Sequence, residues 1–196
     1  MGERLPLATI HDAVLEFLRG RDDAAVFGAQ AVNAYVDEPR MTQDVDILST
    51  RASEFAEELR AYLAQRFHVA MRVRTVKQGV GYRLYQVRKP RNRHLVDVRR
   101  VQELPPCNRF HEVLVATPAE LISHKVLSLV SRRNTAKGFT DAADLRRLLL
   151  AFPELKHAIG SVTDALQAAG ASEQALDAWR ELVAQEIVPD DEESGF

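Results

Sequence analysis

Cysteine is almost absent from this sequence of 196 residues, and its single instance, Cys107, lies in a Pro-Pro-Cys-Asn segment that we expect to be a loop. One cysteine excludes an internal disulfide framework and any zinc-finger spacing. The sequence also lacks an apolar run long enough to cross a membrane, and its first residues lack the apolar core of a signal peptide. We therefore expect a cytoplasmic protein that makes no membrane contact.

Net charge is also small, at −2, and by itself favours no class of partner. The charges are nevertheless segregated along the chain. Residues 66–109 contain twelve Lys and Arg against two acids, and residues 161–196 contain nine acids against one base. This distribution predicts either a surface that binds a polyanion or an internal electrostatic clasp, although basic hairpins that only keep the chain soluble would have the same composition.

The hydrophobic periodicity predicts an α+β fold in which a small mixed or antiparallel sheet is flanked by helices and followed by a helical bundle. We expect a domain over residues 1–116, a helical domain over residues 117–188 and a disordered acidic tail over residues 189–196. The expected strands are residues 24–27, 44–48, 69–76, 82–89, 94–101 and 112–116. The expected helices are residues 9–18, 29–36, 52–67, 118–132, 140–152, 162–168 and 172–187.

Functional side chains gather in residues 28–46. Arg40, Thr42, Asp44 and Asp46 follow one another at a spacing of two. Residues two apart on a strand point to the same face, so we expect the two carboxylates to lie side by side. Such acids repel each other unless a cation lies between them, and Mg²⁺ prefers oxygen ligands. Gly28 stands at a strand-to-helix junction, where free N–H groups can bind phosphate.

Three further charged residues lie where apolar side chains are expected. Asp97 interrupts an apolar strand and needs a cationic partner, which Arg99 could supply. Lys125 and Asp141 fall on the apolar faces of two predicted helices. They could form an ion pair that fixes the helices, Lys125 could extend its ammonium group to solvent, or both could line a binding cleft.

The arrangement of these residues resembles that of the nucleotidyltransferase superfamily related to DNA polymerase β, and most closely its AbiEii-type toxin branch. The first matching block is Gly28-Ala29 followed by Arg40-x-Thr42-x-Asp44-Val45-Asp46. The second block is Lys125, Arg132-Arg133, Lys137 and Asp141-Ala142-Ala143-Asp144-Leu145. The sequence departs from the branch at Ala29, where a second Gly or a Ser is usual, and at Thr140, where a basic residue is usual.

The resemblance implies a Mg²⁺-dependent enzyme that moves a nucleoside monophosphate from an NTP to an acceptor hydroxyl. It implies that Asp44, Asp46 and Asp97 are the catalytic and metal-binding residues. The nucleotide-binding residues that it implies are Gly28, Ala29, Gln30, Arg40, Thr42, Lys125 and Asp141, with Lys125 meeting the triphosphate.

The toxin branch further implies a tRNA acceptor, which the basic segment 66–109 could bind, and a cognate antitoxin as a partner. Two alternatives remain open. The acceptor could be a small molecule, as for aminoglycoside nucleotidyltransferases, or the chain could be a catalytically silent, antitoxin-like protein that binds a nucleotide or a partner.

Overall fold

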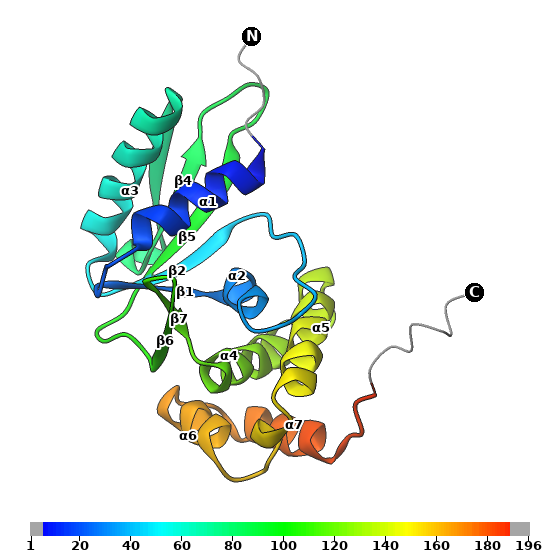
Figure 1. The fold of residues 1–196 in the computed structure, drawn as a ribbon. Coiled ribbons are helices and arrows are strands. Elements are labelled where there is room, and N and C mark those ends of the chain that lie inside the picture. The colour runs from blue at the N-terminus through cyan, green and yellow to red at the C-terminus, as the bar shows by residue number, and fades with distance from the viewer. Residues whose placement is uncertain (1–5, 189–196) are drawn as a thin grey trace. The chain divides into compact units, whose positions relative to one another are not determined.

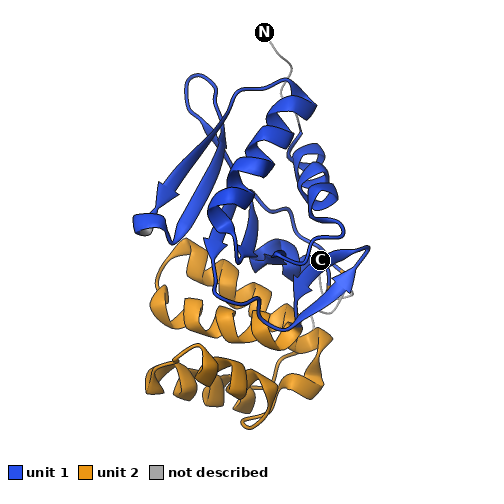
Figure 2. Ribbon diagram, turned by 90° about the vertical axis from the view of Figure 1, so that its left-hand side faces the viewer, with its two compact units in different colours: residues 1–34, 38–117 blue, residues 35–37, 118–196 orange. Residues whose placement is uncertain are grey.

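The computed structural model describes residues 6–188, which form two compact units (Figure 2). Within these residues, unit 1 comprises residues 6–34 and 38–117, and unit 2 comprises residues 35–37 and 118–188. The acidic tail expected over residues 189–196 lies outside the described residues. Among residues 6–188, no helix combines the length and the apolar content needed to cross a membrane.

Unit 1 is built on a seven-stranded mixed sheet with the strand order β3-β4-β5-β2-β1-β7-β6 (Figure 1). The strands are β1 (Ala24–Phe27), β2 (Val45–Ser49), β3 (Met71–Val76), β4 (Gly81–Gln86), β5 (Arg93–Arg100), β6 (Cys107–Phe110) and β7 (Val113–Ala116). The central strand β2 pairs antiparallel with β1 and parallel with β5. All residues of β1 are buried, as is typical of a strand covered on both faces.

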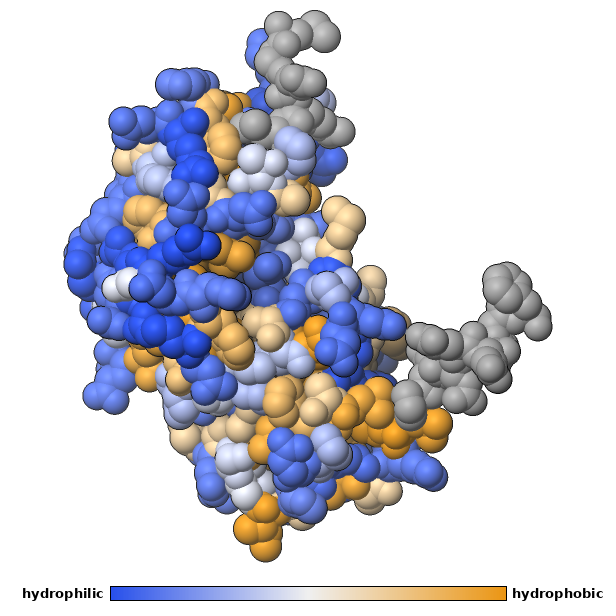
Figure 3. Space-filling model, in the orientation of Figure 1, coloured by the Kyte–Doolittle hydropathy of each residue, from blue (hydrophilic) through white to orange (hydrophobic). Residues whose placement is uncertain are grey.

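Three helices accompany this sheet, namely α1 (Leu7–Leu18), α2 (Gly28–Asn33) and α3 (Ala52–Phe67), and a short 3₁₀ turn, η1 (Lys77–Gly79), joins β3 to β4. α3 packs against β3, β4 and β5, and its stripe of Phe55, Leu59 and Leu63 is fully buried. Because side chains alternate along a strand, the buried residues of β4 and β5 lie beneath α3 and their polar neighbours lie on the opposite, open face. Hydrophilic residues cover most of the visible surface of unit 1 (Figure 3).

Unit 2 is helical and contains α4 (Pro118–Ser131), α5 (Ala136–Ala151), α6 (Ser161–Ala168) and α7 (Glu173–Ala184), with a 3₁₀ turn, η2 (Pro153–Leu155), after α5. α4 packs against the other three helices. The single tryptophan, Trp179, is 1% exposed, and its Nε1 donates a hydrogen bond to the Thr163 hydroxyl. A mixed sheet with flanking helices, followed by a helical bundle, confirms the predicted fold class.

Several local predictions were wrong. The strand predicted over residues 82–89 ends at Gln86, and the helix predicted over residues 172–187 ends at Ala184. Cys107 lies in an edge strand, β6, rather than in a loop, because residues 107–110 pair antiparallel with β7. α5 begins at Ala136 rather than at residue 140, since the Thr135 side chain accepts a hydrogen bond from the Gly138 N–H and caps the helix early. α2 ends at Asn33 rather than at residue 36.

Candidate active site

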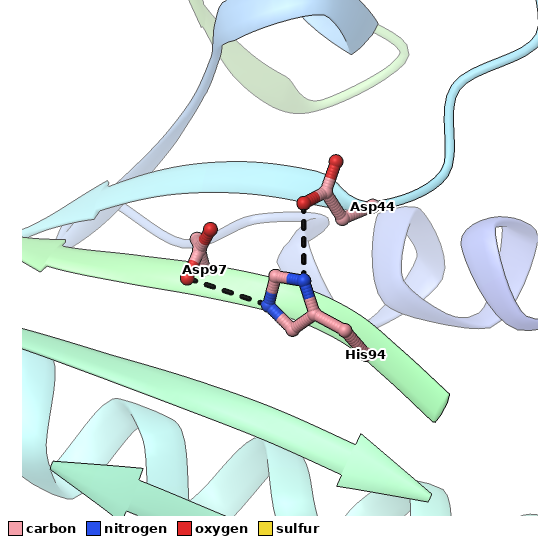
Figure 4. Close-up of side chains that lie close together, drawn as sticks. All are labelled: Asp44, His94 and Asp97. Atoms are coloured by element: carbon pink, nitrogen blue, oxygen red, sulfur yellow. Dashed lines mark ion pairs between the residues drawn. The ribbon is translucent and has the colours of Figure 1, made fainter. Parts of the chain in front are cut away.

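Asp44, His94 and Asp97 form a cluster on two neighbouring parallel strands, β2 and β5, beside the N-terminal end of β2 (Figure 4). Asp44 directly precedes β2, whereas His94 and Asp97 both belong to β5. The imidazole lies between the two carboxylates, with its Nδ1 at 3.2 Å from Asp44 Oδ2 and its Nε2 at 3.4 Å from Asp97 Oδ1. One ligand atom from each residue lies within 4.8 Å of the others.

A β-bulge explains why His94 reaches this cluster. Residues three apart on a regular strand point to opposite faces, which would separate His94 from Asp97. In the pairing of β4 with β5, however, Leu84 lies opposite Val96 and Tyr85 lies opposite His94, so Leu95 is an extra residue on β5. The bulge shifts the alternation by one residue and brings His94 to the face of Asp97. Sequence reasoning missed His94, and no alternation pattern could have shown it.

The charges in this cluster depend strongly on one another. Hydrogen bonds to Asp44 and to Asp97 raise the pKa of His94 to about 10, against the opposing effect of burial. Burial alone would raise the pKa of Asp97, but the positive charges of His94 and Arg83 outweigh it and lower this pKa. Arg83 Nε donates a hydrogen bond to Asp97 Oδ1 at 2.8 Å. The expected need of Asp97 for a cationic partner is therefore met by His94 and Arg83.

A second histidine lies near this cluster. His11 belongs to α1 and is 8% exposed, and burial lowers its pKa despite the nearby negative charge of Asp44. A hydrogen bond between His11 and the backbone of Gln43 links α1 to the residue before Asp44. Sequence reasoning placed His11 in a helix but missed this proximity, which depends on how α1 packs.

Asp46 is not a member of the group formed by Asp44, His94 and Asp97. It lies in β2, in register with Asp97 on one side and with Phe27 on the other. Its carboxyl packs against Gly28, where a Cβ atom would lie 2.2 Å from Asp46 Oδ2. Gly28 also has a φ of +67°, which disfavours any side chain. The glycine therefore leaves room for the Asp46 carboxyl beside the first turn of α2.

The segment between α2 and β2 is held to α2 by side chains. Asn33 donates a hydrogen bond to the Arg40 carbonyl and accepts one from the Arg40 N–H. The hydroxyl of Thr42, which is 7% exposed, donates a hydrogen bond to Gln30 Oε1 at 3.0 Å. These bonds fix the backbone that leads into Asp44.

Unit 2 contains a buried charge cluster of its own. Lys125 Nζ on α4 lies 2.7 Å from Asp141 Oδ1 and 2.7 Å from Asp144 Oδ2, both on α5. Lys125 and Asp141 are each 5% exposed, and Asp144 is fully buried. The expected ion pair between two helices is thus present and includes Asp144 as a second acid. Asp141 and Asp144 are three residues apart and so lie on one face of the helix, and this spacing could have indicated that both acids contact Lys125.

The side-chain oxygen and nitrogen atoms of Asp44, His94 and Asp97 are suitable ligands for a divalent cation. Carboxylate oxygens are the ligands that Mg²⁺ prefers, and an imidazole nitrogen is a ligand for several transition metals. The two carboxylates also require a compensating positive charge, which the His94 imidazolium supplies in this structure. We conclude that Asp44 and Asp97 fit a metal ion, with His94 as an additional ligand or a neighbouring cation.

Comparisons with known proteins agree with this fold. A sequence model of the family described as nucleotidyl transferase AbiEii toxin, type IV toxin–antitoxin system, matches residues 13–194. No curated protein matches the chain.

Two solved structures share the fold. The Megavirus polyadenylate synthase superposes with a TM-score of 0.57 at 12% identity, covering 75% of this chain and 32% of that chain. The chain thus spans about a third of the Megavirus protein. An antigenic nucleotidyltransferase-like protein from Paracoccidioides brasiliensis superposes with a TM-score of 0.50 at 20% identity, covering 88% of this chain and 92% of that chain. At such low identities the likeness concerns the fold alone.

Proposed function

The chain belongs to the AbiEii nucleotidyl transferase toxin family of type IV toxin–antitoxin systems, and from this premise we propose that it transfers a nucleoside monophosphate from an NTP to a hydroxyl of tRNA with the help of Mg²⁺. Membership of a type IV system implies a cognate antitoxin. The proposed catalytic domain comprises residues 1–116, and the proposed helical domain comprises residues 117–188. The cytoplasmic location expected from the sequence stays a prediction.

The observation that carries this proposal is the convergence of Asp44 and Asp97 from two adjacent parallel strands. We assign metal binding to Asp44, Asp46 and Asp97. A bound Mg²⁺ would supply Lewis-acid stabilisation of the phosphate oxygens. The Asp46 carboxyl lies against Gly28, so a phosphate at the first turn of α2 would lie beside a carboxylate. The two negative charges repel each other unless a cation lies between them, and we therefore assign Gly28 and Asp46 to the same metal-bridged site.

The chemical step needs a base, an oriented hydroxyl and a leaving group. Asp97 accepts the proton of the acceptor hydroxyl as the general base. The hydroxyl oxygen then forms a bond to the α-phosphorus of the NTP, and the bond from the α-phosphorus to the bridging oxygen breaks. Pyrophosphate leaves with the electron pair of that bond.

The remaining assigned residues bind the nucleotide. Backbone N–H groups of Gly28, Ala29 and Gln30 face the phosphates, and Arg40 neutralises charge that develops on them. Thr42 holds the loop through its bond to the Gln30 side chain.

In unit 2, Lys125 is assigned to phosphate binding, and Asp141 orients its ammonium group. Because both residues are almost fully buried, this role requires that the Lys125 ammonium group exchange one of its carboxylate partners for a phosphate.

One labelling experiment separates this function from its rivals. The chain is incubated with Mg²⁺, each α-labelled NTP in turn, and either total tRNA or an aminoglycoside. Label on tRNA supports the proposal. Transfer only to the aminoglycoside would assign a small-molecule acceptor instead. NTP binding without transfer to either acceptor would indicate a catalytically silent binding protein and would refute the proposal.

A further inference from the structure

A row of charged side chains crosses the open face of unit 1 from Asp97 to the edge of the sheet. Asp97 on β5 is in register with Arg83 on β4, and Arg83 is in register with Arg74 on β3. Partners directly opposite each other on neighbouring strands point to the same face. The ion pair between Arg83 and Asp97, at 2.8 Å, agrees with this. The row thus leads from the candidate active site to the edge strand.

A second row runs beside the first. His94 is in register with Tyr85, and Tyr85 is in register with Arg72. The rings of His94 and Tyr85 are in contact, with their centroids 5.1 Å apart. An aromatic side chain therefore adjoins the cluster of Asp44, His94 and Asp97, and an arginine lies directly beyond it.

The two rows end in a hollow of about 300 Å³ lined by Arg72, Arg74, Tyr85, Arg91 and Asn92. The three arginines are exposed. Within residues 6–188, no acid lies within ion-pair distance of any of them, and the one acid in the rows, Asp97, is already paired with Arg83. As far as the described residues show, the hollow therefore carries uncompensated positive charge, beside one aromatic ring.

We propose that this face binds the single-stranded end of the RNA acceptor, with its phosphates at Arg72, Arg74 and Arg91 and with one base against Tyr85. The inference rests on the proposed function, which requires an acceptor hydroxyl to reach Asp97. Neighbouring strands lie about 4.8 Å apart, so the hollow on β3 is roughly 10 Å from β5, a distance that a short run of nucleotides spans.

The combination of residues favours a single strand over other polyanions. A basic groove that follows the backbone, together with an aromatic platform for a base, is the usual means of binding single-stranded nucleic acids. A duplex would keep its bases stacked inside and would leave the Tyr85 ring without a partner. The triphosphate of the donor would use the arginines but would not need the ring.

Salt dependence tests the arginines. The affinity of the full chain for a short fluorescent single-stranded RNA is measured by anisotropy in EDTA, so that no transfer occurs. One variant combines the substitutions Arg72→Gln, Arg74→Gln and Arg91→Gln. The matched control is Arg100→Gln, because Arg100 is exposed but points to the face of β5 opposite that of Asp97. Each phosphate contact contributes about 0.7 to the slope of log affinity against log salt for a single strand.

We expect the triple variant to lose about two units of this slope and the Arg100 control to lose none. Between about 50 and 200 mM salt, the wild-type chain should therefore lose roughly 20-fold more affinity than the triple variant. An unchanged slope in the triple variant would overturn the proposal. The same titration is repeated with a duplex of the same sequence. If the triple variant weakens binding of the duplex as much as binding of the single strand, the proposal is overturned for a single strand.

Tyr85 is tested separately. Tyr85→Ala should weaken RNA binding roughly tenfold through lost stacking, whereas Tyr85→Phe should bind like the wild type. Equal affinity of all three proteins would contradict a base at this ring.

Binding of a fluorescent NTP distinguishes the remaining outcomes. If the triple variant loses NTP affinity rather than RNA affinity, the hollow holds the donor and the inference is wrong. RNA binding with the expected slope but without nucleotide transfer would overturn the proposed function alone. Transfer to tRNA at an unchanged rate and KM in the triple variant would overturn the binding face alone.

Discussion

Replacing Gly28 by alanine tests how the first turn of α2 and Asp46 depend on each other. Gly28 has a φ of +67°, and its new Cβ would lie 2.2 Å from Asp46 Oδ2 and 2.8 Å from Asp46 Cγ. The left-handed backbone costs about 1–2 kcal/mol for a residue with a side chain. Overpacking against the Asp46 carboxyl adds about 1–3 kcal/mol. We therefore expect Gly28→Ala to lower the free energy of unfolding by about 2–5 kcal/mol.

Gly20 provides the matched control, because its φ is +71° but a Cβ atom there would meet nothing within 4 Å. Gly20→Ala should therefore lower the free energy of unfolding only by the backbone cost, about 1–2 kcal/mol. Urea unfolding followed by circular dichroism measures both variants. The displaced Asp46 carboxyl should also weaken divalent-cation binding in Gly28→Ala, which titration calorimetry detects. Equal destabilisation by the two substitutions would refute the close packing of Gly28 and Asp46.

Three further predictions concern the interior and the ion pairs. Lys125→Met should lower the free energy of unfolding by about 3–5 kcal/mol, because it removes the cation that lies 2.7 Å from both buried carboxylates and leaves them only the longer contacts with Arg132 and Arg147. Chemical denaturation would show this loss. Trp179→Ala should cost about 3–5 kcal/mol in the same assay, since Trp179 is 1% exposed, and Trp179→Phe should cost less. The hydrogen bond from Arg21 lowers the pKa of Asp23 below its usual value near 3.8. This bond therefore stabilises the fold above that pH and less so as the pH falls through the lower pKa of the folded state. The free energy of unfolding is measured at neutral pH and at about pH 3. Asp23→Asn should reduce the difference between these two values by up to about 1 kcal/mol.

The sequence allowed the fold class to be predicted because its elements are locally consistent. The stripe of Phe55, Leu59 and Leu63 lies at helical spacing, and α3 buries all three side chains. β6 was missed because it is a short edge strand of exposed or half-buried residues, stabilised by pairing with β7 and not by an apolar pattern of its own. Strand pairing between distant segments leaves no such local signal.

Only part of the candidate site was predicted, because only part of it has a local signal in the sequence. The spacing within residues 28–46 indicated Asp44 and Asp46, and the lone acid in an apolar strand indicated Asp97. His94 could not be found, because it reaches Asp97 only through the bulge at Leu95. The bulge depends on how β4 and β5 pair, and neither strand encodes that register alone.

The most direct test of the proposed active site is nucleotide transfer by the variants Asp44→Asn and Asp97→Asn. Single-turnover transfer of an α-labelled nucleoside monophosphate to tRNA is compared with that of wild type, after circular dichroism has shown that each variant is folded. Asp22→Asn, at an exposed aspartate remote in the sequence from both residues, serves as the control. We predict that the two site variants lose at least about 100-fold in rate while the control keeps the wild-type rate. Transfer by Asp97→Asn within a few-fold of wild type would contradict the assignment.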